Sequence, residues 1–153
     1  MVDGLKGKAK LAYTAGILDG EGTVFLERRV TRKGDYRNYV LTVVISNTNE
    51  WLIKWLEFNY GGNVSSYQQK HPNRLLSWRW RIQATKAMEF LRLVLPYLIL
   101  KRPQAEIAIQ FQLNRSHRHR TDEEKAVDEA QKLLISSYNS NSGCAKGRLK
   151  KYG

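Results

Sequence analysis

The chain has 153 residues, 42% of them hydrophobic, which is enough for one domain with a buried core. Its 26 Lys and Arg residues against 14 Asp and Glu residues give a net charge of +12, and this excess favours a polyanionic partner. The single cysteine, Cys144, excludes an intramolecular disulfide, and no apolar run is long enough for a membrane span or a signal peptide. We expect an intracellular protein, in a prokaryotic cytoplasm or an organelle, with no membrane partner and no small-molecule substrate.

The first predicted helix begins near Leu11 and has one face that is almost free of side-chain bulk. This face consists of Ala12, Ala15, Gly16 and Asp19, which recur at helical spacing. Small residues allow two helix axes to approach closely, so we predict that this face is a dimer interface. Because the chain holds one such helix and no internal repeat, the simplest partner is a second copy, in a homodimer.

Glu21 is predicted at the C-terminal end of this helix, where Gly20 and Gly22 stop it. An acid is unfavourable there because a helix C-terminus carries partial negative charge. Pairing of two helices would bring two such acids together, and a divalent metal would relieve their repulsion. The Glu21 carboxylate and the Gly20 carbonyl are the candidate metal ligands. The alternative is an ordinary helix with a glycine cap and a solvated glutamate.

Two strand pairs are predicted after this helix. Alternating residues predict strands over 23–32 and 36–46, and a second hairpin over 64–71 and 74–82. A helix lies between the hairpins, with Asn47 or Asn49 as its N-cap, and ends near Tyr60. In the last strand Trp78, Trp80 and Ile82 share one face, whereas Arg79 and Arg81 share the other.

Helices are predicted for the rest of the domain. Thr85 is expected to cap a helix that ends at Leu95, and another helix opens at Pro103 and runs to about Asn114. Residues 121–124 read as a capping box that starts a last helix, which ends near Ser137. We therefore predict a single domain over residues 1–138 and a basic, disordered tail over residues 139–153.

This order predicts an α+β fold with an αββαββα core, plus C-terminal helices. Two hairpins side by side would form a four-stranded antiparallel sheet. Helices would cover the face that holds the tryptophans and leave the other face open.

The open face is predicted to bind DNA. Its outward side chains are polar and rich in Arg and Lys, which read base edges in the major groove or contact phosphates. A strand of eight or nine residues spans roughly 28 Å, which matches about eight base pairs. The alternative is a solvated sheet face. The candidate DNA-binding residues are Glu27, Arg29, Thr31, Arg32, Lys33, Asn38, Thr42, Ser65, Tyr67, Gln69, Lys70, Arg74, Arg79 and Arg81, and further phosphate contacts are expected from Arg115, Arg118 and Arg120.

Two segments carry a family resemblance. Residues 14–22 (TAGILDGEG) resemble the signature of the LAGLIDADG homing endonucleases, and residues 95–105 (LPYLILKRPQA) resemble the segment around that family's catalytic lysine. The order of elements also fits, over about residues 8–138. The resemblance implies a site-specific, divalent-metal-dependent double-stranded DNA endonuclease of the intron-homing type. Members with one motif act as homodimers, on long pseudo-palindromic sites.

The resemblance also implies roles for single residues. The candidate catalytic residues are Glu21, Lys101 and Asn47. One Glu21 from each subunit would bind Mg²⁺ or Mn²⁺, Lys101 aligns with the catalytic lysine, and Asn47 falls where many members have a glutamine that orders metal-bound water. Ser46 competes with Asn47 for that role, and Asp19 is expected to be a structural hydrogen bonder at the helix end.

Two other functions are compatible with parts of the sequence. One is a maturase-like or regulatory nucleic-acid-binding protein on the same scaffold, without DNA cleavage. The other is a generic basic RNA-binding accessory protein, which explains the charge and leaves the first helix unexplained.

Overall fold

The computed structural model describes residues 4–29, 38–68, 70–115 and 119–148, with side chains described as far as residue 140. The elements follow the predicted order of helix, two strands, helix, two strands and helices. They are α1 (Gly7–Glu21), β1 (Gly22–Arg29), β2 (Asn38–Asn47), α2 (Glu50–Tyr60), β3 (Asn63–Tyr67), β4 (Ser77–Gln83), α3 (Ala84–Val94), the 3-10 helix η1 (Leu95–Tyr97), α4 (Arg102–Leu113) and α5 (Asp122–Arg148).

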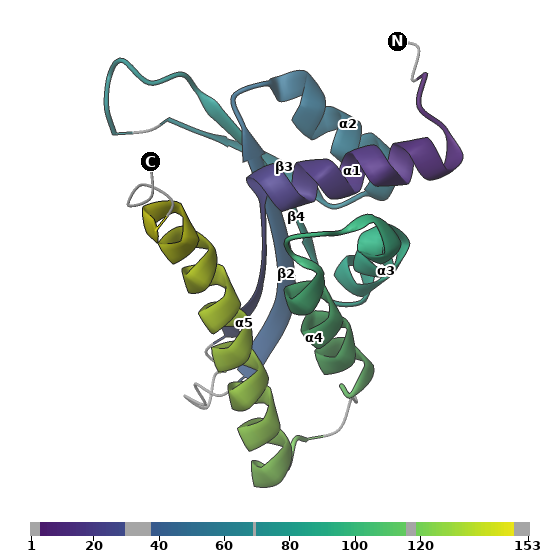
Figure 1. The fold of residues 1–153 in the computed structure, drawn as a ribbon, viewed down its shortest axis with the longest axis vertical. Helices are drawn as coiled ribbons and strands as arrows, with labels where there is room; N and C mark the ends of the chain where they lie inside the picture. The colour runs from purple at the N-terminus through teal and green to yellow at the C-terminus, as the bar shows by residue number, and fades with distance from the viewer. Residues whose placement is uncertain (1–3, 30–37, 69, 116–118, 149–153) are drawn as a thin grey trace.

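The strands form one antiparallel sheet in the order β1-β2-β4-β3, so the two predicted hairpins lie side by side through β2 and β4. Figure 1 shows α3 and α4 on one side of the sheet, α1 and α2 across its upper end, and α5 along β1. The predicted α+β fold with a four-stranded antiparallel sheet is confirmed.

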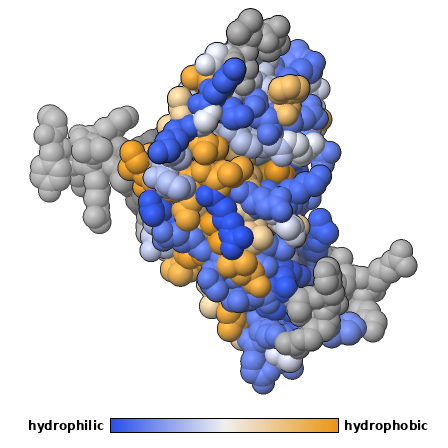
Figure 2. Space-filling view, turned by 90° about the vertical axis from the view of Figure 1, so that its right-hand side faces the viewer, coloured by the Kyte–Doolittle hydropathy of each residue, from blue (hydrophilic) through white to orange (hydrophobic). Residues whose placement is uncertain are grey.

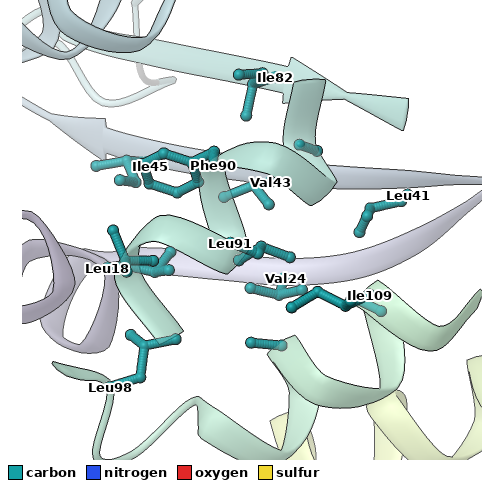
Figure 3. Packing of buried hydrophobic residues seen from close by; sticks show 14 of the residues in the cluster. Leu18, Val24, Leu41, Val43, Ile45, Ile82, Phe90, Leu91, Leu98 and Ile109 are labelled. Carbon is teal, nitrogen blue, oxygen red and sulfur yellow. The ribbon is translucent and has the colours of Figure 1, made fainter. Parts of the chain in front are cut away.

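The core lies between the sheet and the helices and fixes which strand residues face outward. Its side chains include Leu18, Val24, Leu41, Val43, Ile45, Ile82, Phe90, Leu91, Leu98 and Ile109 (Figure 3). Burial of each such side chain contributes about 1.5–3 kcal/mol. A slip of one residue in a strand would turn its apolar set to solvent, so this core specifies the register.

Two helix starts agree with the predicted capping residues. The side chain of Asn49 accepts a hydrogen bond from the Leu52 N–H at 3.3 Å and caps α2. At the start of α5, the Thr121 N–H donates to Glu124 at 2.8 Å and the Glu124 N–H donates to the Thr121 hydroxyl at 3.2 Å. The predicted capping box is confirmed.

The predicted cap of α3 is wrong. β4 continues to Gln83, which pairs with Thr42, and α3 begins immediately at Ala84. Thr85 therefore lies inside the first turn, and the chain changes direction at Ala84, whose φ is +54°. In the same hairpin the strands are shorter than predicted, because β3 ends at Tyr67 and β4 begins at Ser77.

The last helix is longer than predicted. α5 passes Ser137 and continues to Arg148, through most of the segment that was expected to be a disordered tail. Asn139 holds the first part of this extension, because its amide donates to the Val24 carbonyl at 3.1 Å and accepts from Gln104 at 3.2 Å. α5 thus covers the free edge of β1, where unpaired backbone groups would otherwise be open to another strand. In the described part of the chain, no helix has the length and apolar character needed to cross a membrane.

Candidate active site and nucleic-acid interface

Glu21 is the last residue of α1, and its side chain is exposed at the junction between helix and sheet. Gly22 starts β1 directly, and its N–H donates to the Leu18 carbonyl. A Cβ on Gly22 would lie 2.4 Å from Leu18 Cδ1, so this position needs glycine for space. Its φ of −98° is open to any residue, so the backbone angle does not require glycine. Because no loop separates α1 from β1, Glu21 is held at the end of the sheet.

Asp19 ties a distant segment to the same helix end. Its carboxylate accepts hydrogen bonds from the backbone N–H groups of Ile99 at 2.9 Å, Leu100 at 3.2 Å and Lys101 at 2.9 Å. The Lys101 ammonium in turn donates to the main-chain carbonyl of Asp19. The predicted role of Asp19 as a structural hydrogen bonder is confirmed. As a result, Lys101 reaches the end of α1 that carries Glu21.

Asn47 and Ser46 lie on opposite sides of the sheet at the end of β2. Asn47 pairs with Trp78, which packs against the core, and its side chain accepts from the Asn49 N–H at 2.8 Å. Ser46 pairs with Arg79, an exposed residue of the open face. Because paired residues share a face, Ser46 faces the side on which DNA is expected and Asn47 faces the helices.

The C-terminal end of α1 could bind a metal ion only with additional ligands from outside this helix end. In the described ranges, no three His, Cys, Asp or Glu side chains come together as a metal-binding group. Of the two acids at the end of α1, Asp19 already accepts three backbone hydrogen bonds. Glu21 and carbonyl oxygens are suitable hard ligands for a divalent cation, but one copy of the chain supplies too few of them.

The predicted dimer interface is divided between surface and core. Ala15 is fully buried against its own chain, so it is not available to a partner. Ala12 and Gly16 are exposed, and a Cβ built on Gly16 or Gly20 meets no atom within 4 Å. Asp19 binds the segment at Ile99 instead of facing outward. Residues three apart in a helix point in directions that differ by tens of degrees, so Ala15 faces the core while Ala12 stays exposed.

Apolar side chains gather near this exposed face of α1. Ile99 and Leu100, beside the end of α1, are 81% and 70% exposed, and Tyr13 on α1 is 47% exposed. Figure 2 shows a band of hydrophobic surface on the side of the molecule where α1, α3 and α4 lie in Figure 1. Such surface in a small basic protein is typical of an interaction site.

The open face of the sheet carries several of the predicted DNA-binding residues. Arg29, Ser65 and Arg79 are exposed, and the Arg79 guanidinium lies 4.7 Å from the centre of the half-buried Tyr67 ring. Lys70 and Arg74 are exposed in the connection between β3 and β4. The predicted contacts that lie outside the described residues are Thr31, Arg32, Lys33, Gln69 and Arg118.

Glu27 and Thr42 belong to a hydrogen-bonded network within the sheet. Thr42 is fully buried, so its prediction as a DNA contact is wrong. Its hydroxyl donates to Glu27 at 3.2 Å, Arg81 forms an ion pair with the same carboxylate, and Gln83 donates to it at 2.8 Å. Burial alone would raise the pKa of Glu27, but the hydrogen bond and charge of Arg81, with the Thr42 hydrogen bond, hold that pKa below its ordinary value.

Gln83 is a further residue of the open face, beyond the predicted end of the strand. It continues the outward series of Arg79 and Arg81, so the period of two already pointed to it. The strand was predicted to end at Ile82, so the predicted DNA-binding residues of this strand end at Arg81.

Two predicted phosphate contacts have internal partners. Arg120 forms an ion pair with Asp128 at 2.6 Å, and these side chains are 11% and 2% exposed. Arg115 donates a hydrogen bond to the side chain of Asn38 at 3.0 Å. Asn38 is itself a predicted DNA-binding residue, so this bond engages both side chains within the protein. Arg115 thus joins the end of α4 to β2, and Arg120 is held at the start of α5, while their contacts to phosphates stay a prediction.

No family model matches the sequence, and no curated protein matches it. Solved structures match its fold. The homing endonuclease I-CvuI, in complex with its target in the presence of Ca, aligns with a TM-score of 0.63 and 20% identity, covering 85% of this chain and 80% of that one. The archaeal intron-encoded homing endonuclease I-Vdi141I, complexed with DNA, gives a TM-score of 0.55 at 14% identity, with 85% and 96% covered. The homing endonuclease I-TnaI gives 0.50 at 17% identity, with 71% and 72% covered.

Proposed function

Because the chain has the fold of the LAGLIDADG homing endonucleases, we propose that it is a site-specific, divalent-metal-dependent DNA endonuclease of the intron-homing type. The observation that carries this proposal is the contact of Asp19 with residues 99–101, since it brings Lys101 to the helix end that holds Glu21. A protein that only binds DNA has no need for an exposed acid and a lysine at one end of its binding sheet.

We further propose that the active form is a homodimer, which pairs through the exposed small residues of α1. One copy supplies Glu21 and the Gly20 carbonyl, and the second copy completes the set of oxygen ligands. A metal held there, Mg²⁺ or Mn²⁺, would supply charge stabilisation at the scissile phosphate and lower the pKa of bound water. Two sheets related by a dyad would fit a long, pseudo-palindromic duplex, inside a prokaryotic cell or an organelle.

The residues of the chain have separate tasks in this scheme. The Lys101 ammonium offsets negative charge that develops on the phosphate during hydrolysis. We assign the role of orienting a water molecule to Ser46 in preference to Asn47, because Ser46 is paired with Arg79 of the open face. Arg29 and Arg79 would contact phosphates or bases.

The direct test is a cleavage assay on DNA from the gene's own insertion locus, with Mg²⁺, Ca²⁺ or a chelator. We expect the wild type to cut with Mg²⁺, and the Glu21→Gln variant to keep DNA binding and lose cleavage. Glu89→Gln removes the same charge from an exposed position on α3 and should cut normally. A wild-type protein that binds this DNA tightly and never cuts it would favour a regulatory or maturase-like function instead.

A further inference from the structure

A polar network joins three strands on the open face of the sheet. Glu27 comes from β1, Thr42 from β2, and Arg81 and Gln83 from β4. One oxygen of the Glu27 carboxylate, Oε2, accepts from Arg81 Nη2, from Gln83 Nε2 at 2.8 Å and from the Thr42 hydroxyl at 3.2 Å. All three donors lie on this one oxygen, so the Glu27 side chain is held in place by residues of β2 and β4.

The network fixes the orientation of the Gln83 amide. Its Nε2 donates to Glu27 at 2.8 Å and to the Thr42 hydroxyl at 3.0 Å, so both amide hydrogens are used. A flipped amide would place its oxygen against the Glu27 carboxylate, with two acceptors facing each other. The low pKa of Glu27 keeps that carboxylate ionised at neutral pH. Gln83 is therefore left with one free function, the acceptor Oε1.

Arg81, in contrast to Gln83, can offer only hydrogen-bond donors to DNA. Its guanidinium uses Nη2 for Glu27 and carries further N–H donors, with 35% of the side chain exposed. An arginine that is held by a carboxylate within the sheet has a defined position and less freedom to follow the phosphates. It can donate to the acceptor edge of a guanine in the major groove.

We propose that Glu27 is a specificity-determining residue, which sets Gln83 as an acceptor and Arg81 as a donor toward the major groove. The inference rests on the proposed DNA-binding function. Adenine and cytosine present an amino group in that groove, whereas guanine and thymine present acceptors. Arg81 and Gln83 are two residues apart, roughly 7 Å along the strand and about two base-pair steps. The site should therefore hold an adenine or cytosine about two base pairs from a guanine.

The test is binding selection from a pool of random duplexes, in a buffer with Ca²⁺, for the wild type and three variants. Glu27→Gln gives position 27 an amide that can donate, so Gln83 can flip. This variant should lose about tenfold or more of the preference for adenine or cytosine over guanine or thymine at one position in each half-site. Gln83→Met should lose the same preference. The control Glu89→Gln, with the same change in net charge, should select the wild-type sequence.

Two results would overturn the proposal. If Glu27→Gln selects the wild-type bases with undiminished strength while Gln83→Met does not, Glu27 has no part in specificity. If Gln83→Met also leaves the base preference at every position unchanged, Gln83 does not read a base. Both results require that the wild type enriches a sequence. Failure of the wild type to enrich any duplex would instead contradict the proposed function, and this inference with it.

Discussion

At the scale of single residues, Asp19 has the most consequential set of contacts. A carboxylate at a helix C-terminus is electrostatically unfavourable, but here three backbone N–H groups of residues 99–101 offset the cost. The Lys101 ammonium adds a cation at the same helix end, on the Asp19 carbonyl. The pair of contacts couples the position of Lys101 to the end of α1.

Replacement of Asp19 by Asn should release this segment. The amide keeps one acceptor oxygen but turns an NH₂ group toward the N–H donors, so we expect the free energy of unfolding to fall by about 1–3 kcal/mol. Urea unfolding measures this loss, and hydrogen exchange of the Ile99 and Lys101 amides should become faster. Glu57→Gln, at an exposed site on α2, is the matched control. Unchanged exchange at those amides would show that Asp19 does not hold the segment.

The ion pair of Glu27 predicts a pH dependence of stability. Because the folded state lowers the pKa of Glu27, its stabilisation is full above the ordinary value of 4.5 and is lost as pH falls through the lowered value. At pH 7, Glu27→Gln should be less stable than the wild type by about 1 kcal/mol. Urea unfolding at several pH values should show this difference shrink below about pH 4.5. A difference that is constant with pH would contradict the assignment.

At the scale of elements, the link between α2 and β3 depends on two glycines with positive φ. Gly62 has a φ of +90°, and a Cβ there would lie 2.6 Å from the Arg81 carbonyl and 2.9 Å from Trp80 Nε1. The Trp80 indole also donates to the Gly61 carbonyl at 2.7 Å, which fastens the link to β4.

Gly62→Ala should therefore destabilise the fold by at least about 2 kcal/mol, through backbone strain and a clash with β4. Gly4→Ala is the control, because a Cβ at Gly4 meets no atom within 4 Å and the position lies outside the proposed dimer interface. Thermal unfolding of the two variants compares the positions. Equal stability of Gly62→Ala and the wild type would mean that the link can move away from β4.

Some features of the helices and strands follow from local sequence patterns, and others depend on contacts between distant residues. Alternation in β1, β2 and β4 predicted the sheet and its faces, because the apolar side of a strand must meet the core. Capping signals at Asn49 and Thr121 were sufficient because they act within one turn. The length of α5 was not predictable in this way. Asn139, in its extension, contacts Val24 and Gln104, which are distant in sequence.

The candidate site shows the same limit. Glu21 and Lys101 could be singled out by a family resemblance, but no local pattern places them at one helix end. Asn38 and Thr42 were predicted to bind DNA because they are polar and alternate along a strand, and Arg120 because it lies in a basic connector. Each instead has a partner within the chain, and sequence periodicity cannot distinguish a side chain that faces outward from one that is satisfied internally.

At the scale of the whole molecule, the exposed small residues of α1 matter because a larger side chain would keep a second helix away. In the single chain a Cβ at Gly16 meets no atom within 4 Å, and Gly16→Leu should raise helix stability by about 1 kcal/mol. The same change should prevent dimer formation, which sedimentation or light scattering measures. Ala126→Leu, at an exposed position on α5, should leave the dimer intact. A Gly16→Leu protein that remains dimeric would place the interface elsewhere.

In the proposed homodimer, two copies of Glu21 act together at the cut site. Wild type and Glu21→Gln can be mixed at constant total protein and equilibrated, and double-strand cleavage is then measured against the wild-type fraction. If both acids are needed, an equal mixture should retain about one quarter of the wild-type activity, because random pairing leaves about one dimer in four with two intact acids. Retention of about one half, with linear dependence on the wild-type fraction, would show that one chain cuts alone and would contradict the account.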